Sequence, residues 1–254
     1  ALSRMELRTR MVANIAADLL MLNYDISKLA SSAALLNASG AVQKKLLEEK
    51  IRENPSIYSE FSILNVSGKE VLKTGSSAQK DLKDYSKTEL FRSAVSGSEP
   101  AGAVEYGGYT PPALVLAEPL AGRPGARAEG FLLARMSLAY LGEVVRVIGR
   151  NSSGELGFMD AGGQLISDSL GRSIISPGIK APDEALRAAE IASQKGLDVF
   201  KEEISLKGRP CLVSVANVGG TRWWVFEVVD AANTPNRALW ARRVILTGVL
   251  LIFI

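Results

Sequence analysis

Residues 61–73 read FSILNVSGKEVLK, and this stretch decides the fold. Two runs rich in branched and aromatic side chains flank a short turn at Gly68, which is the pattern of a β-hairpin. Residues 156–167 read LGFMDAGGQLIS and repeat it: Gly163 lies 95 positions after Gly68, and each glycine follows an Asn or Asp by three positions. The chain therefore predicts two copies of one hairpin-containing module.

Each hairpin is followed by a helical pattern and then by three more strand patterns. In the first copy, Ser86 with Glu89 three residues later predicts a capping box that opens a short helix within residues 84–95. A second helix, at about residues 137–148, connects the copies. This order predicts an α+β fold with two antiparallel sheets and flanking helices. The remaining expected elements are strands 103–106, 113–117 and 130–136, a helix at 183–195, and strands 199–206, 210–218 and 222–229.

The first 54 residues form a helical region. From Ser3 to Glu53, apolar side chains recur every three or four residues without a proline, and only Gly40 interrupts the pattern. One continuous helix of this length would reach about 68 Å, so we expect part of it to project toward a membrane or to form a weak homodimer with a second copy. The alternative is two helices broken near residues 37–40.

Residues 244–254 read VILTGVLLIFI and carry no charge. Eleven residues are fewer than the roughly 20 that span a bilayer, so we expect the start of a transmembrane helix. Arg242 and Arg243 precede this run as an interfacial flank would. A buried C-terminal strand or core helix is the alternative.

The composition excludes several functions. The 254 residues carry a formal charge of only +3 with both signs scattered, which argues against nucleic-acid binding. The chain contains no histidine, and this removes the usual general base and zinc ligand. The adjacent Glu202 and Glu203 would point to opposite faces of a strand. We therefore expect no enzyme activity, no metal and no cofactor.

Residues 84–91, DYSKTELF, with Ala94 after them, resemble the D-x-S-x-R-x-[YW]-[FY] segment of the double Cache family. Tyr106, Thr110-Pro111 and residues 117–120 and 130–141 extend the resemblance. The family comprises exported sensor regions of bacterial histidine kinases, chemoreceptors and diguanylate cyclases. The resemblance implies a long N-terminal helix followed by two PAS-like Cache modules.

The implied organisation has five parts. It places a helix at 1–54, a membrane-distal module at 55–136, a linker at 137–153, a membrane-proximal module at 154–231, and a juxtamembrane segment at 232–254.

The departures from the family pattern bear on the ligand. Family members that bind amino acids use an Arg where this chain has Thr88, an aromatic where it has Leu90, and acids near Gly108 and Arg135. A free amino acid held in the family's usual way is therefore disfavoured. Phe91 is retained, although it also fits a core position on its helix. The resemblance implies a distal ligand site formed by Tyr85, Thr88, Phe91, Tyr106, Tyr109, Thr110 and Arg135.

Because Arg135 is among the implied site residues, we expect a small-molecule ligand with a carboxylate or another anionic group. The resemblance puts this residue on the pocket side of its strand, and a guanidinium suits bidentate binding of an anion. The alternative is an ion pair between Arg135 and a nearby acid such as Glu105 or Glu118.

These features predict the extracytoplasmic sensing domain of a bacterial membrane receptor, most simply a sensor histidine kinase, held by flanking transmembrane helices. A chemoreceptor or a diguanylate cyclase is the alternative receptor class. A scaffold that dimerises without binding a ligand is the other alternative. A ligand-sized concavity lined by Tyr85, Phe91, Tyr106 and Tyr109 would favour the sensor.

Overall fold

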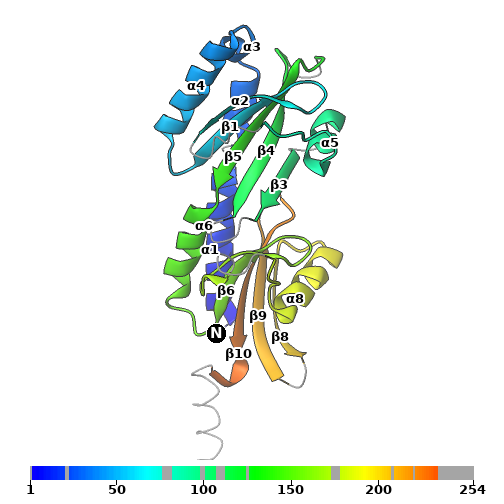
Figure 1. The fold of residues 1–254 in the computed structure, drawn as a ribbon. Coiled ribbons are helices and arrows are strands. Elements are labelled where there is room, and N and C mark those ends of the chain that lie inside the picture. The colour runs from blue at the N-terminus through cyan, green and yellow to red at the C-terminus, as the bar shows by residue number, and fades with distance from the viewer. Residues whose placement is uncertain are drawn as a thin grey trace, which may run out of the picture. The chain divides into compact units, whose positions relative to one another are not determined.

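The computed structural model divides into two compact units, Asp18–Tyr140 and Ala1–Ala17 with Leu141–Ile254. We call them the β1–β5 unit and the β6–β10 unit after their strands (Figure 1). The structure describes residues 2–20, 23–75, 82–97, 101–106, 112–123, 126–172, 178–206, 209–219 and 221–233.

The β1–β5 unit contains a five-stranded antiparallel sheet of order β2-β1-β5-β4-β3. Its strands are β1 (Tyr58–Leu64), β2 (Glu70–Gly75), β3 (Ala101–Glu105), β4 (Ala113–Leu120) and β5 (Gly130–Ser137). Helix α5 (Glu89–Ser96) lies between β2 and β3 in the chain. The hairpin, the helix and the three later strands expected for the first copy are confirmed.

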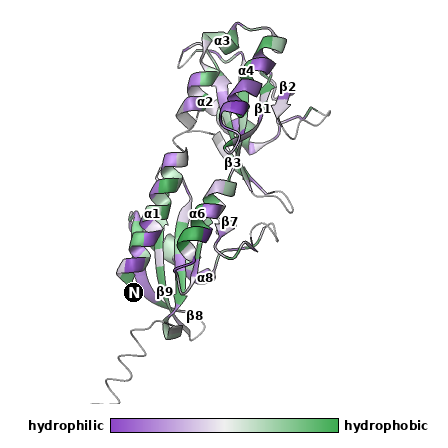
Figure 2. Cartoon of the chain, turned by 90° about the vertical axis from the view of Figure 1, so that its left-hand side faces the viewer, coloured by the Kyte–Doolittle hydropathy of each residue, from purple (hydrophilic) through white to green (hydrophobic). Residues whose placement is uncertain are grey.

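The two faces of this sheet have different covers. Helix α5 packs on one face, where Phe91 meets Phe131 edge to face with ring centroids 5.1 Å apart. Helices α2 (Asn23–Ala30) and α4 (Gly40–Glu53) contact strands from the side of Phe61 and Leu132, which are completely buried. Figure 2 shows hydrophilic and hydrophobic residues interspersed along α4, as expected of a helix with one face on a sheet.

The β6–β10 unit repeats the arrangement, with the order β7-β6-β10-β9-β8. Helix α8 (Asp183–Gln194) presents four buried alanines to one face of the sheet, so it lies close to the strands. This unit also holds α6 (Ala139–Gly149) from Leu141 onward and the short 3-10 helix η1 (Ala231–Asn233). Its strands are β6 (Glu155–Met159), β7 (Leu165–Asp168), β8 (Val199–Leu206), β9 (Arg209–Asn217) and β10 (Trp224–Asp230).

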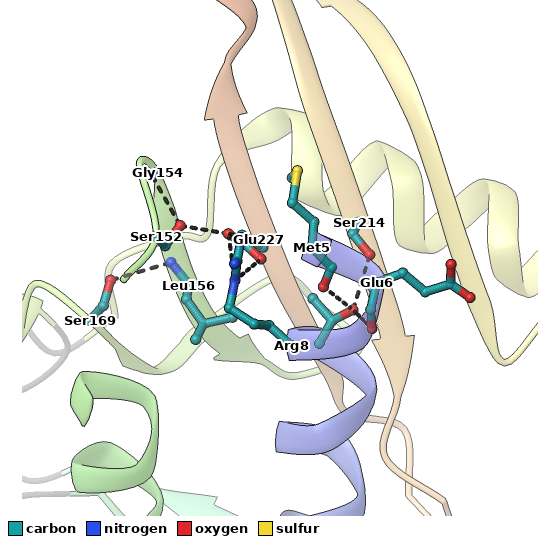
Figure 3. Close-up of polar contacts among 10 residues, drawn as sticks. Met5, Glu6, Arg8, Ser152, Gly154, Leu156, Ser169, Ser214 and Glu227 are labelled. Atoms are coloured by element: carbon teal, nitrogen blue, oxygen red, sulfur yellow. Dashed lines mark hydrogen bonds and ion pairs between the residues drawn. The ribbon is translucent and has the colours of Figure 1, made fainter. Parts of the chain in front are cut away.

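Helix α1 (Leu2–Leu20) is anchored on the other face of this second sheet by a buried ion pair. The Arg8 guanidinium donates to both carboxylate oxygens of Glu227, with Nε 3.1 and 3.0 Å from Oε1 and Oε2 and Nη2 2.5 Å from Oε1 (Figure 3). The Ser152 hydroxyl also donates to Oε1, at 2.5 Å. A second polar contact joins the Thr9 and Ser214 hydroxyls at 3.0 Å. Because the Glu227 side chain is 0% exposed, its charge depends on these partners.

The N-terminal region begins with a helix, as expected, but the uninterrupted helix over residues 3–53 is wrong. It contains α1, α2, α3 (Ala33–Leu36) and α4, and the break near residues 37–40 given as the alternative is confirmed. Ser32 starts α3 by accepting a hydrogen bond from the Leu35 amide, and extended backbone at Ser39 precedes α4. Serines that satisfy or redirect backbone groups in this way compete with helix continuation.

The two hairpin turns repeat one hydrogen-bond pattern. In each, a side-chain oxygen accepts from the backbone N–H groups two and four residues later, at 3.0 and 3.1 Å for Asn65 and at 2.9 and 2.8 Å for Asp160. The carbonyl of the turn glycine then accepts a distant amide, from Tyr85 to Gly68 and from Ala181 to Gly163. The internal repeat expected from the sequence is therefore present in the backbone contacts.

Replacing Gly68 with alanine should destabilise the β1–β5 unit by about 3 kcal/mol. Gly68 has φ +84°, and an added Cβ would lie 2.9 Å from the backbone of Ser86. Gly97→Ala is the matched control, because Gly97 has φ +66° but an added Cβ meets nothing within 4 Å; we expect a loss of about 1 kcal/mol there. Urea unfolding measures both, and equal losses would contradict the role of the close approach at Gly68.

The C-terminal expectation falls on residues that the structure does not describe. The segment 244–254 lies outside the described residues, as does most of 232–254. Within the described ranges, no helix combines the length and hydropathy of a membrane span.

Candidate functional site

Tyr85 is positioned by the repeated turn of the β1–β5 unit. Its backbone N–H donates to the Gly68 carbonyl at 2.8 Å, and its side chain is only 8% exposed. Glu70 holds the same segment: its carboxylate accepts from the Lys83 backbone N–H at 2.6 Å, and its own N–H donates to the Lys83 carbonyl. These bonds fix the chain that leads into α5, so the aromatic ring is directed onto the sheet.

Thr88 caps helix α5, and the N-cap expected at Ser86 is wrong. The Thr88 hydroxyl accepts from the Phe91 N–H at 3.2 Å and donates to the Tyr85 carbonyl at 2.8 Å. The Ser86 N–H instead donates to the Asp84 carboxylate, in a turn before the helix. Both roles suit the residue types, because Thr and Ser oxygens serve at helix starts and in turns. The Thr88 hydroxyl is thus engaged in local structure.

A small hollow lies beside Tyr85 on the α5 face of the sheet, and we call it the Tyr85 hollow. Its volume is about 10 Å³, which is space for about one water molecule. Six residues line it: Glu60, Ser62, Tyr85, Val115, Leu133 and Arg135. The register of β1 against β5 brings four of these residues together, since Glu60 pairs with Arg135 and Ser62 pairs with Leu133.

One wall of the hollow adjoins a buried group of charges. The Lys73 ammonium lies 3.2 Å from Oε1 of Glu60 and 3.9 Å from Oε1 of Glu70. The three side chains are 5%, 8% and 0% exposed. Among the described residues, Oε1 of Glu70 has no hydrogen-bond partner. Lys73 therefore forms ion pairs with two carboxylates inside this unit.

The Arg135 guanidinium forms an ion pair with Glu105 at the end of β3. This is one of the pairings given as the alternative to ligand binding. Glu118 is not the partner, because it pairs with Leu132 on the opposite face of the sheet and accepts a hydrogen bond from Ser27. Burial on that face raises the pKa of the Glu118 carboxyl.

The Tyr85 hydroxyl is the neutral member of this polar group. Burial raises its pKa, and the negative charges of Glu70, Glu105 and Glu60 add to the shift, while Arg135 opposes it. Tyr85 therefore stays protonated and remains a hydrogen-bond donor at physiological pH. Around it, three carboxylates face two cations, Lys73 and Arg135.

The structure brings together two of the seven site residues expected from the sequence, Tyr85 and Arg135. Phe91 lies in the core under α5, and Tyr106 is half-buried just after β3. Tyr109 and Thr110 lie outside the described residues. Sequence reasoning missed three of the lining residues, Glu60, Ser62 and Val115.

The second repeat lines the equivalent face differently: its charged side chains there, Glu155, Asp168 and Arg172, form ion pairs with one another. The equivalent registers pair Glu155 with Val228 and Gly157 with Phe226, so a valine stands at the position of Arg135. Phe226 has no exposed surface, and its ring lies directly against Gly157. Ala181 takes the place of Tyr85, as the turn hydrogen bonds show. The second repeat therefore has no counterpart of Tyr85 or Arg135, although it retains a carboxylate, Glu155, at the position of Glu60.

The arrangement is suited to binding polar groups. Within the described ranges, no cluster of three or more Cys, Asp or Glu side chains could hold a metal ion. The charges beside the hollow form carboxylate–cation pairs, which can exchange partners with a charged ligand.

The fold formed by these two repeats is that of double Cache sensor domains, so the resemblance seen in the sequence is confirmed at the level of the fold. No family model matches the chain, and no curated protein matches it in sequence.

Three solved structures illustrate the likeness. The extracellular domain of histidine kinase rpHK1S-Z16 has a TM-score of 0.68 at 12% identity, covering 91% of this chain and 94% of that chain. The ligand-binding domain of Campylobacter jejuni chemoreceptor Tlp3, in complex with 4-methylisoleucine, has a TM-score of 0.63 at 11% identity, covering 91% and 90%. That of Pseudomonas aeruginosa chemoreceptor PctC, in complex with GABA, has a TM-score of 0.61 at 16% identity, covering 87% and 96%.

Proposed function

We propose that the chain is an extracytoplasmic sensing domain whose β1–β5 unit binds a small molecule at the Tyr85 hollow. The observation that carries this proposal is the contrast between the repeats, since Ala181, Phe226 and Val228 in the β6–β10 unit replace Tyr85, Leu133 and Arg135 beside the hollow. Similar folds in the Tlp3 and PctC domains hold small ligands, which supports the same role here.

The ligand carries a carboxylate or another anionic group, and Arg135 receives it. A guanidinium forms two parallel hydrogen bonds to such a group, and the Tyr85 and Ser62 hydroxyls add neutral ones. The 4-methylisoleucine and GABA bound by the similar domains each carry a carboxylate. Since the hollow holds about one water molecule, binding has to widen it.

The receptor is a sensor histidine kinase in the membrane, with this domain outside the cytoplasm. The TM-score of 0.68 with the extracellular domain of a histidine kinase supports this choice, and the chemoreceptor domains with TM-scores of 0.63 and 0.61 make a chemoreceptor the alternative. Ligand binding would signal by favouring one of two pre-existing states. The proposal includes a weak homodimer through α1.

A scaffold without a ligand is the second candidate, and the size of the hollow favours it. Small-molecule pockets usually measure about 300–1,000 Å³, far above the volume found beside Tyr85.

Thermal unfolding with panels of organic acids, amines and amino acids separates the two candidates. A ligand at 100 times its dissociation constant should stabilise the chain by about 2.7 kcal/mol, or about 5–10 °C in melting temperature. We expect an organic acid to bind and Arg135→Ala to abolish the shift. The matched control is Arg146→Ala, which removes an exposed arginine paired with Glu143 on α6.

Each other result has a defined meaning. If no compound stabilises the wild-type chain, the scaffold role is correct. An amine that binds, or an acid whose shift survives Arg135→Ala unchanged, would show that Arg135 is not the anion-binding residue.

A further inference from the structure

The ion pair between Arg135 and Glu105 lies at the margin of the Tyr85 hollow. The Arg135 Nη1 group donates to Oε2 of Glu105, reaching from β5 across β4 to the edge strand β3. Both side chains are partly open to solvent, at 26% and 36% exposure. A carboxylate is thus already bound where the anionic group of a ligand would bind.

The ion pair between Arg8 and Glu227 provides a comparison within the same chain. There the guanidinium donates to both carboxylate oxygens, Ser152 adds a third donor, and the carboxylate is fully buried. Such a pair cannot open without leaving a buried charge. Glu105 has none of these constraints, because water can solvate its carboxylate when the ion pair with Arg135 breaks.

The Arg135–Glu105 contact also uses little of the donor capacity of the arginine. Only Nη1 of Arg135 donates to Glu105, and among the described residues its Nε and Nη2 groups have no acceptor. A guanidinium offers a planar fork that fits two oxygens of one anion. A free carboxylate can therefore bind Arg135 with better geometry than Glu105 does.

We infer that Glu105 is a specificity-determining residue, whose carboxylate competes with the ligand for Arg135. The inference rests on the proposed function of the Tyr85 hollow. Glu105 makes weak or monodentate anions poor ligands, since they cannot replace an existing ion pair. It thereby selects ligands whose anionic group binds in a bidentate manner, and it raises the concentration at which they bind.

The test is acetate titration of the wild-type chain and Glu105→Gln, followed by the NMR signal of the Arg135 Nε–H group. Removing the competing charge should strengthen acetate binding by about fivefold, which corresponds to the value of an exposed ion pair. The matched control is Glu143→Gln, which opens the exposed pair with Arg146 and should leave acetate binding unchanged.

The possible results are separable from those of the ligand panels. Stronger acetate binding in Glu105→Gln that disappears in Glu105→Gln/Arg135→Ala supports competition between Glu105 and an anion for Arg135, whatever the panels find. Equal acetate binding in wild type and Glu105→Gln, or none in either, overturns the inference even if the panels find an organic acid. Unfolding of Glu105→Gln would show that the pair is structural, and it would also overturn the inference.

Discussion

Replacing Arg8 with methionine is expected to lower the free energy of unfolding of the β6–β10 unit by about 3–5 kcal/mol. Methionine keeps much of the side-chain volume but leaves the fully buried Glu227 carboxylate with Ser152 as its remaining donor. The loss comes mainly from an uncompensated buried charge. Urea unfolding measures it, and hydrogen exchange of the β9 and β10 amides assigns it to this unit.

Two further variants test this explanation. Arg10→Met removes an arginine from the same helix whose side chain is 60% exposed, so it should cost less than about 0.5 kcal/mol. Arg8→Met/Glu227→Leu removes both charges and should recover most of the stability. A double variant as unstable as Arg8→Met would show that packing, and not the unpaired carboxylate, causes the loss.

The second large effect is expected from Lys73→Met in the β1–β5 unit, again about 3–5 kcal/mol. Lys73 is the cation near both Glu60 and Glu70, and all three side chains are nearly inaccessible to solvent. Its removal leaves two like charges buried together on the polar side of the Tyr85 hollow. Unfolding in urea gives the loss, and hydrogen exchange of the β1 and β2 amides locates it.

Lys69→Met is the matched control, because Lys69 lies in the same hairpin but is exposed. It should change stability by less than about 0.5 kcal/mol. If Lys73→Met is as stable as Lys69→Met, the two glutamates are not held as charged groups by Lys73.

The sequence predicted the ten strands that the structure describes and their order along the chain, because alternation and turn residues are local signals. It failed in the N-terminal region, where apolar spacing continues through Ser32 and Ser39 although the helix does not. Helical periodicity reports which side chains face a core. It does not report where a serine takes over the hydrogen bond of a backbone group.

The site was predicted less completely, because its lining depends on strand pairing. Tyr85 and Arg135 could be found from the resemblance, but Glu60 and Ser62 reach the hollow only through the register of β1 against β5. The period of two in a strand places Glu60 and Ser62 on the same face as Leu64, and this much could have been read from the sequence. The partner strand begins 66 residues after Leu64, so no local pattern indicates which residues lie opposite.

Phe226 occupies in one repeat the position at which Leu133 lines the hollow in the other, and this difference has an evolutionary consequence. Two copies of a module that descend from one ancestor need not serve the same purpose. Substitutions around Tyr85 affect the hydrophobic core of the β1–β5 unit, while the core that contains Phe226 is left unchanged. Since most substitutions cost stability, this separation would let the proposed ligand site change without loss of stability in the β6–β10 unit.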